Sequence, residues 1–256
     1  RLIPLLVAMR RAGVSVDIPF AEQLYDEMGS QRLVMLGELK ELVGFEINVA
    51  SGDDLKRAFD AHGLDYPRTD KGAPSFRADF LKSVEHPIGQ KIVEVRQRDK
   101  LRNVFIKSYL LDNHVGGKVY CSFNQLRGTE GGTRSGRFSS SDPNLQNIPI
   151  RTALGKRIRQ AFTHDTDHVA WRKYDASQIE YRFLAHFAVG KGADEIRQRY
   201  SEDPNVDYHF ETGQLIKKLT GLELARAYIK NVNFGNVYGQ GEEGLALLLG
   251  LPLSEA

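Results

Sequence analysis

The 256-residue sequence predicts an α+β protein, because helical and strand-forming stretches occupy separate parts of the chain. Residues 1–113 carry apolar side chains at helical spacing, residues 117–169 change to alternating runs and glycine-rich loops, and the remainder is helical again. A content of 41% hydrophobic and 27% charged residues is typical of a globular protein and excludes disorder over the whole chain.

The first third is predicted to be helical. Apolar residues at helical spacing from Leu2 to Met9 stop at Gly13, and Val14 to Ile18 is predicted to be a short extended piece. Ser51, with an acidic residue three positions later, predicts the N-cap of a further helix that Gly63 ends.

A loop is predicted from Tyr66 to Ser75, and a longer helix follows Pro87 and runs to about Leu111. The charged residues of that helix are mostly basic: Lys91, Arg96, Arg98, Lys100, Arg102 and Lys107, against Glu94 and Asp99. A basic helix is either a solvated surface or a binding face for backbone phosphates, and the sequence leaves both interpretations open.

Strand and loop patterns begin at Gly117. Val119, Cys121 and Phe123 alternate as in a strand, and the glycine-rich segment 128–136 is predicted to be a loop. Segment 131–163 has six basic residues and one acid, a net charge of +5 inside a chain whose total is +2. This local excess favours a polyanionic partner.

The last third begins with a predicted strand, His168 to Tyr174, and turns helical from about Ser177. Asp207 is expected to open one later helix. Leu222 to Tyr238 is expected to form another, which the following glycines end.

Asp175 lies where the predicted strand gives way to a helix, within Tyr-Asp-Ala-Ser-Gln-Ile-Glu-Tyr-Arg at 174–182. A carboxylate there can ligate a hard cation such as Mg²⁺, although an Asp at a helix start is also an ordinary N-cap. Glu180 follows five residues later, about 500° of helical rotation away. The two carboxylates therefore do not share a helix face, and Glu180 needs a role other than metal ligation.

Segment 226–239 places Arg226, Lys230, Phe234 and Tyr238 four residues apart, on a slowly winding helical stripe about 18 Å long. Two cations followed by two aromatic rings suit a ligand with phosphates at one end and a flat base at the other. An amphipathic helix with core aromatics and solvated cations explains the same spacing.

Segment 133–149 carries Arg137 and the amides Gln146 and Asn147 on a loop that two prolines brace. Such side chains can read the acceptor-rich edges of the DNA minor groove. The composition alone equally fits a surface loop of turn residues.

Together, in order and spacing, these segments resemble the family A DNA polymerases of the bacterial polymerase I and phage replicative type. The resemblance rests on Ser-Ser-Asp-Pro-Asn-Leu-Gln-Asn-Ile-Pro at 140–149, Asp-x-Ser-Gln-Ile-Glu at 175–180 and Arg-x3-Lys-x3-Phe-Gly-x2-Tyr-Gly at 226–239. It covers nearly the whole chain and implies the N-terminal portion of a polymerase module. The implied right-hand fold, incomplete in this chain, has a helical thumb with a palm-proximal N-terminal helix at 1–112, the first part of an antiparallel-sheet palm at 113–190 and the first part of helical fingers at 191–256.

The resemblance also assigns roles to single residues. Asp175 and the backbone carbonyl of Ala176 match the ligands of Mg²⁺, and the resemblance implies that the intact enzyme holds two such ions. Glu180 matches the steric gate against a ribose 2′-OH. The nucleotide-binding positions are matched by Glu180, Gln178, His209, Arg226, Lys230, Phe234 and Tyr238. Arg226 and Lys230, with His209, would bind the triphosphate, Phe234 would pack on the sugar and base, and Tyr238 would lie beside the templating base. Asp175 and Lys230 are the expected catalytic residues.

Contacts to primer–template DNA are matched by Arg137, Gln146 and Asn147, and the basic helix that carries Arg98, Lys100 and Arg102 matches the thumb helix that holds the duplex. The implied activity is template-directed DNA synthesis, with transfer of a nucleotidyl group from a deoxynucleoside triphosphate to a primer 3′-OH by a two-metal mechanism.

Some residues depart from the family pattern. Ala176 stands where bacterial members usually have an aromatic, Tyr181 replaces the common Leu, and Lys173 shares a predicted strand face with Asp175. None of the seven histidines is followed by Asp-Glu, the motif that supplies the family's second carboxylate. This chain alone is therefore expected not to polymerise, and the missing palm and fingers are expected from the same chain or from a second polypeptide.

A single cysteine excludes an intrachain disulfide, and no apolar run approaches the roughly 18 residues of a membrane span. We expect no membrane partner and a cytoplasmic location, in a bacterium or a phage-infected host. Two other functions stay open, a single-subunit RNA polymerase and a non-catalytic fragment that binds primer–template DNA.

Overall fold

The computed structural model describes residues 2–126, 128, 132–165, 170–249 and 252–253. The chain forms two compact units, Arg1–Trp171 and Arg172–Ala256. Within the described residues, no helix has both the length and the apolar character that crossing a membrane requires.

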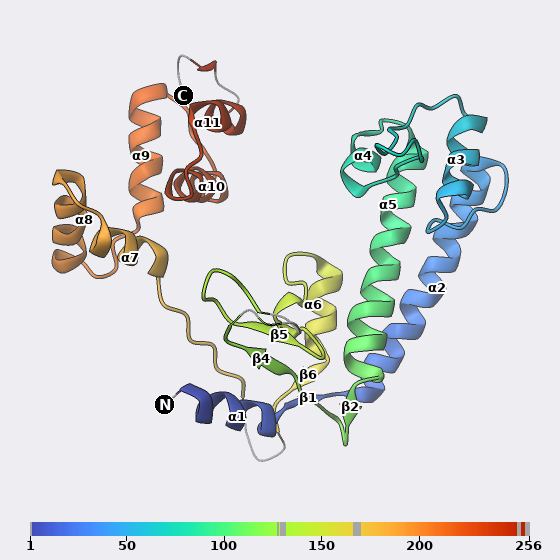
Figure 1. Cartoon of the computed structure of the whole chain (residues 1–256), viewed down its shortest axis with the longest axis horizontal. Helices are drawn as coiled ribbons and strands as arrows, with labels where there is room; N and C mark the ends of the chain where they lie inside the picture. The colour runs from blue at the N-terminus through green and yellow to red at the C-terminus, as the bar shows by residue number, and fades with distance from the viewer. Residues whose placement is uncertain (1, 127, 129–131, 166–169, 250–251, 254–256) are drawn as a thin grey trace. The chain divides into compact units, whose positions relative to one another are not determined.

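The first unit is built around two long helices that run side by side, α2 (Ile18–Val43) and α5 (Pro87–Lys100) (Figure 1). Asp17 caps α2 by accepting a hydrogen bond from the Phe20 amide at 3.0 Å. Helix α5 continues as the π-helical segment η1 (Leu101–Leu111), where the Asp112 amide donates to the Lys107 carbonyl at 2.8 Å. The predicted helix from Pro87 to Leu111 is confirmed, in two consecutive helical forms.

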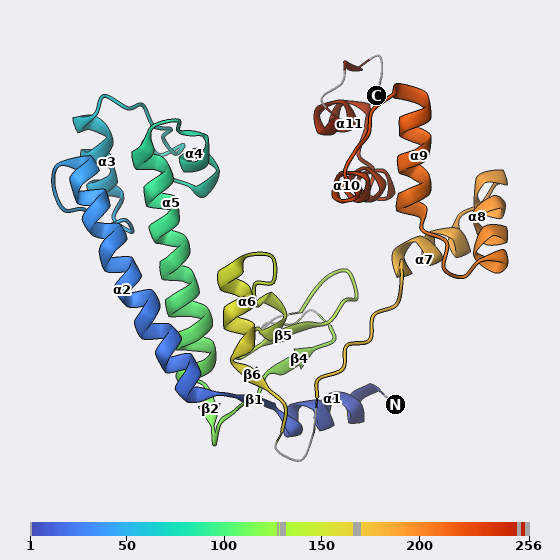
Figure 2. The same cartoon turned by 180° about the vertical axis from the view of Figure 1, so that it is seen from behind.

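A separate hydrophobic cluster holds α3 (Gly52–Ala61) and α4 (Ala78–Ser83) at one end of the long helices, as both views show (Figure 2). The predicted N-cap is present, because the Ser51 hydroxyl accepts a hydrogen bond from the Asp54 amide at 3.2 Å. Phe59 is fully buried, and its ring lies 5.0 Å from that of Phe76. Apolar burial therefore fixes this end of the unit.

Small antiparallel sheets form the other end of the unit. The first has the strand order β2 (His114–Val115), β3 (Lys118–Val119), β1 (Val14–Val16) and β6 (Phe162–Thr163). The second pairs β4 (Ser122–Asn124) with β5 (Ser139–Ser141). Helix α6 (Ala153–Gln160) contacts η1 and β6, α1 (Leu2–Ala12) contacts β4, and the 3₁₀ turn η2 (Leu145–Asn147) contacts β5.

Fully buried apolar residues of this end, among them Met28, Ile106 and Ile158, join α2, η1 and α6 to the first sheet in one core. The alternation from Val119 to Phe123 does not form one strand. Strand β3 ends at Val119, Cys121 is buried between the strands, and β4 begins at Ser122 in the other sheet. Two short strands with different partners produce the same alternation as one longer strand.

The described part of the second unit is helical: α7 (Ile179–Phe187), α8 (Lys191–Glu202), α9 (Tyr208–Thr220), α10 (Arg226–Val237) and α11 (Glu242–Leu249). Helices α9 and α10 pack closely, because a Cβ at Gly213 would clash with the Ile229 Cδ1 atom. Asp207 opens α9 as predicted, and Gly239, with φ 82°, follows α10. Helix α10 begins at Arg226 and not at Leu222.

The strand predicted from His168 to Tyr174 is not present where the chain is described. Positions 168 and 169 lie outside the described residues, and residues 170–174 have no regular secondary structure. A strand needs a neighbour to satisfy its backbone hydrogen bonds, and no described strand pairs with this segment. The sequence of this segment did not show whether a neighbouring strand is present to pair with it.

Candidate functional site

Asp175 lies in the irregular segment before α7, with 81% of its side chain exposed. The Lys173 Nζ atom is 3.9 Å from its Oδ2 atom, although residues 170–174 form no strand. Both side chains are more than four-fifths exposed, so this ion pair is weak. Gln178, in the left-handed conformation, is the N-cap residue of α7. The interpretation of Asp175 as an ordinary helix cap is therefore wrong, and its carboxylate is accessible to a ligand.

Gln178 connects the start of α7 to the start of α9. Its Nε2 atom donates to the Val206 carbonyl at 2.7 Å. Its Oε1 atom accepts from the Tyr208 amide at 3.1 Å and from the Tyr200 hydroxyl at 3.4 Å. Glu180 lies in the first turn of α7, half-buried. These contacts give Gln178 a structural function that its place in the motif did not indicate.

Asp207 ties the start of α9 to the start of α10. Its Oδ1 atom accepts from the amides of His209 at 3.0 Å and Phe210 at 3.3 Å, and its Oδ2 atom accepts from the Arg226 guanidinium at 2.7 Å and 3.1 Å. Burial by itself would raise the pKa of Asp207, but these hydrogen bonds outweigh it and hold the pKa below its ordinary value. Arg226 is thereby held at the first turn of α10, still largely exposed.

His209 is buried, with only 4% of its surface exposed. The Asn233 Nδ2 atom lies 2.9 Å from its Nδ1 atom, and because an amide nitrogen donates, Nδ1 accepts and Nε2 carries the ring hydrogen. Burial lowers the pKa of His209, Asp207 opposes that effect, and Arg226 and Lys230 add to it. The imidazole is therefore held neutral near pH 7.

The predicted stripe on α10 is present. Lys230 is exposed, with its Nζ atom 5.4 Å from the centre of the Phe234 ring, and the rings of Phe234 and Tyr238 stack at 6.3 Å. The buried positions of α10 are Ile229, Val232 and Asn233. Phe234 is half-buried at the border of the core, whereas Tyr238 is 68% exposed, so the interpretation as a core residue is wrong for Tyr238.

The amides predicted to contact DNA lie on the 3₁₀ turn η2 in the first unit. Asn144 Oδ1 accepts from the Gln146 amide at 3.2 Å and from the Ser140 hydroxyl at 3.0 Å, which leaves the side chains of Gln146 and Asn147 exposed. Arg137, also exposed, precedes β5 of the same segment. This arrangement presents three polar side chains on one short stretch of surface chain.

The basic helix uses much of its charge inside the protein. The Arg102 guanidinium lies 3.6 Å over the Tyr25 ring of α2 and donates to the Tyr25 carbonyl at 3.1 Å. Arg98 donates to the Gln31 Oε1 atom at 2.6 Å. Lys100 is exposed. Two of the three predicted thumb contacts therefore fasten α5 and η1 to α2, and their DNA-binding role stays a prediction.

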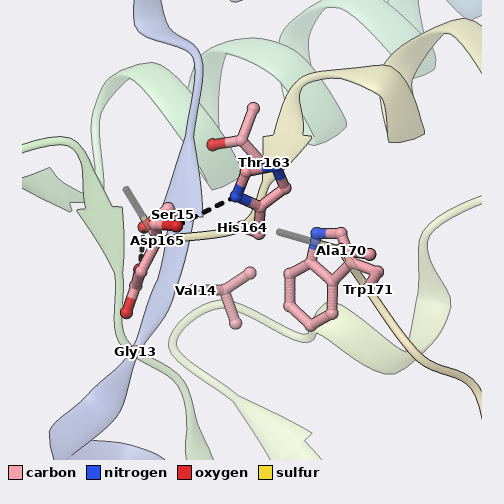
Figure 3. A pocket seen from close by; sticks show the side chains of 8 residues that line it. All are labelled: Gly13, Val14, Ser15, Thr163, His164, Asp165, Ala170 and Trp171. Carbon is pink, nitrogen blue, oxygen red and sulfur yellow. Dashed lines mark hydrogen bonds between the residues drawn. The ribbon is translucent and has the colours of Figure 1, made fainter. Parts of the chain in front are cut away.

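A pocket of about 220 Å³ opens beside strands β1 and β6 (Figure 3). Its lining residues are Gly13, Val14, Ser15, Thr163, His164, Asp165, Ala170 and Trp171. The Asp165 carboxylate there accepts from the Ser15 hydroxyl at 2.5 Å and from Lys118 at 2.8 Å. None of the predicted site residues lines this pocket.

Comparison with solved structures indicates the class of protein. The structure resembles the POL domain of Pol1 from M. smegmatis, solved in complex with DNA primer-template and dNTP, with a TM-score of 0.72, 30% identity, and coverage of 98% of this chain and 44% of that one. The mixed helix and sheet architecture thus resembles part of a polymerase domain.

The sequence comparisons then define the family. The family model of DNA polymerase family A matches residues 19–256, and this chain belongs to that family. It is 34% identical to DNA polymerase I of Helicobacter pylori and 36% identical to the thermostable DNA polymerase I of Thermus filiformis, over 99% and 98% of this chain and 27% and 30% of those proteins. It is 29% identical to DNA polymerase DpoZ of Vibrio phage phiVC8, over 98% of this chain and 41% of that protein. The chain thus spans less than half the length of each of these relatives.

Proposed function

We propose that this chain is part of a template-directed DNA polymerase, which transfers a nucleotidyl group from a deoxynucleoside triphosphate to a primer 3′-OH. The observation that carries the proposal is the stripe on α10, where Arg226, Lys230, Phe234 and Tyr238 lie in the order that a triphosphate, sugar and base require. The bound primer-template and dNTP of the M. smegmatis protein support the same partners here. Replication would take place in the cytoplasm of a bacterium or of a phage-infected host.

The residues of the second unit would act by position and charge. Arg226, held by Asp207, and the exposed Lys230 would neutralise and orient the triphosphate, with His209 beside them. Phe234 and Tyr238 would pack against the sugar and base, and Glu180 would exclude a ribose 2′-OH. Holding the α-phosphate near the primer 3′-OH is itself a large part of the rate acceleration in such reactions.

Asp175 and the backbone carbonyl of Ala176 would hold Mg²⁺, since both offer the oxygen donors that this cation prefers and the carboxylate is exposed. When bound, the metal would favour deprotonation of the primer 3′-OH and stabilise charge on the leaving pyrophosphate. Among the residues that the structure describes, no three His, Cys, Asp or Glu side chains form a metal-binding group. We propose that palm residues of the same chain or of a second polypeptide supply the second carboxylate and complete the second metal site.

The division into thumb (1–112), first part of palm (113–190) and first part of fingers (191–256) is part of this proposal. In it, Lys100, Arg137, Gln146 and Asn147 are the exposed candidates for contact with primer–template DNA. Membership of a DNA polymerase family favours this function over a single-subunit RNA polymerase.

The test is primer extension with Mg²⁺ by the intact gene product. Asp175→Ala should lower the rate by at least about a hundredfold, because a metal ligand is lost, and Asp65→Ala, which removes another exposed carboxylate, should leave it unchanged. Equal rates for Asp175→Ala and wild type would refute the metal assignment. If the wild type binds primer–template DNA but does not extend the primer, the non-catalytic alternative is supported. If it incorporates ribonucleotides as well as deoxynucleotides, the RNA polymerase alternative is supported.

A further inference from the structure

Tyr181 buries a hydroxyl group that has no hydrogen-bond partner within the described residues. The residue is 7% exposed and lies on α7, next to Glu180. Burying an unpaired hydroxyl is unfavourable. Contacts of the aromatic ring must therefore offset the cost of keeping a tyrosine at this position.

The ring of Tyr181 contacts two proposed nucleotide-binding residues. One is His209, which is proposed to lie beside the triphosphate, and the other is Phe234, which is proposed to pack on the sugar and base. The centre of the Tyr181 ring lies 5.3 Å from the His209 ring at 86° and 5.9 Å from the Phe234 ring at 61°, both edge-to-face arrangements. It also stacks at 6.2 Å with Tyr208, in the first turn of α9. Tyr181 is therefore the point where α7, α9 and α10 meet through aromatic rings.

We propose that Tyr181 is a positioning residue, whose ring fixes the orientation of Phe234 and His209 for an incoming deoxynucleotide. This inference rests on the proposed function. Edge-to-face contacts restrict how a neighbouring ring can turn. The other ring contacts of Phe234 include Tyr238, which is itself 68% exposed and gives weaker support. A leucine would leave one side of the Phe234 ring without its aromatic neighbour.

The ring and not the hydroxyl carries this role. Burial, with a smaller contribution from Tyr200, raises the pKa of Tyr181 to about 12, so the hydroxyl stays protonated over the working range of an enzyme. Tyr181→Phe keeps the ring and removes only the unpaired group. It should therefore behave like the wild type, whereas Tyr181→Leu should not.

The first test is single-nucleotide incorporation by the intact polymerase. Tyr181→Leu should raise the KM for the deoxynucleotide about fivefold and change kcat by less than about twofold, because ring pairs are worth about 1 kcal/mol. Tyr181→Phe should keep both constants within about twofold of the wild type. Tyr200→Leu is the matched control, since that half-buried ring contacts Tyr208 but is not among the ring neighbours of Phe234 or His209. An unchanged KM in Tyr181→Leu, or an equal rise in Tyr181→Phe or Tyr200→Leu, would contradict the proposal.

The second test does not depend on activity. NMR titration of the intact polymerase should show the pKa of His209 rising toward its ordinary value in Tyr181→Leu, because water reaches the imidazole. The pKa should stay low in Tyr181→Phe and Tyr200→Leu. If the wild type extends no primer, the proposed function fails. An unchanged His209 pKa in Tyr181→Leu would separately overturn the packing on which the positioning role depends.

Discussion

At the scale of single residues, the Lys173 side chain places a positive charge close to the exposed carboxylate of Asp175. Its ammonium group lies 3.9 Å from the Asp175 carboxylate, in a segment where both side chains are almost fully solvated. A cation at that distance would compete with Mg²⁺ for the carboxylate.

Lys173→Gln should therefore lower the Mg²⁺ concentration for half-maximal primer extension, by about two- to fivefold, the range expected for an exposed ion pair. The measurement is a Mg²⁺ titration of the intact polymerase, with Arg172→Gln, an exposed cation one position away, as control. An unchanged or increased Mg²⁺ requirement in Lys173→Gln would show that the ammonium does not compete.

His209 makes the second unit sensitive to acid. Because burial holds its pKa below about 6.5, the unfolded state binds more protons than the folded state as the pH falls through that value. The stability that the neutral imidazole contributes is thus complete above about pH 6.5 and is lost progressively below it.

Denaturant unfolding of the chain, followed by a probe in the second unit, should show lower stability at pH 5.5 than at pH 7.5. His209→Gln should reduce this pH dependence, since glutamine does not titrate there. An equal slope in the variant and the wild type would rule out His209 as its cause.

At the scale of elements, Asp207 connects the start of α9 to the start of α10. Asp207 caps α9 through one carboxylate oxygen and holds Arg226 of α10 through the other. Capping needs only an acceptor, whereas the ion pair needs the charge, so two substitutions separate the effects.

Asp207→Ala should lower the free energy of unfolding by about 1 kcal/mol through loss of the cap, and Asp207→Asn by less. Both variants should release Arg226 and change the KM for the deoxynucleotide alike. Denaturation curves measure the loss of stability, and incorporation kinetics measure the change in KM. Equal losses of stability in Asp207→Ala and Asp207→Asn would contradict the capping role.

Two helix starts were predictable because a capping side chain acts locally, whereas the start of α10, which has no capping side chain, was placed four residues too early. Ser51 and Asp207 cap the helices that they were expected to open, and the four-residue spacing from Arg226 to Tyr238 placed the stripe correctly. Strands depend on partners distant in sequence, which is why the alternation around Cys121 divides between two sheets and the segment before Asp175 forms no strand within the described residues.

At the scale of the whole molecule, the family could be predicted from the sequence, whereas the packing of side chains could not. The order of three short segments was enough to indicate the polymerase family, which the comparisons confirm. The contacts of Tyr181 with His209 and of Arg102 with Tyr25 were not predictable, because they join residues 28 and 77 positions apart. A basic residue in the sequence does not reveal whether it will bind a phosphate or a neighbouring helix.

The central claim is that α10 binds the incoming nucleotide, and Lys230→Ala tests it most directly. The KM for the deoxynucleotide and the Kd for primer–template DNA are measured on the intact polymerase, with Lys218→Ala, an exposed lysine of α9, as control. We predict that Lys230→Ala weakens deoxynucleotide use by about tenfold or more, the scale of one charged hydrogen bond, with little change in DNA binding. Equal losses in both constants, or no loss beyond that of Lys218→Ala, would contradict the claim.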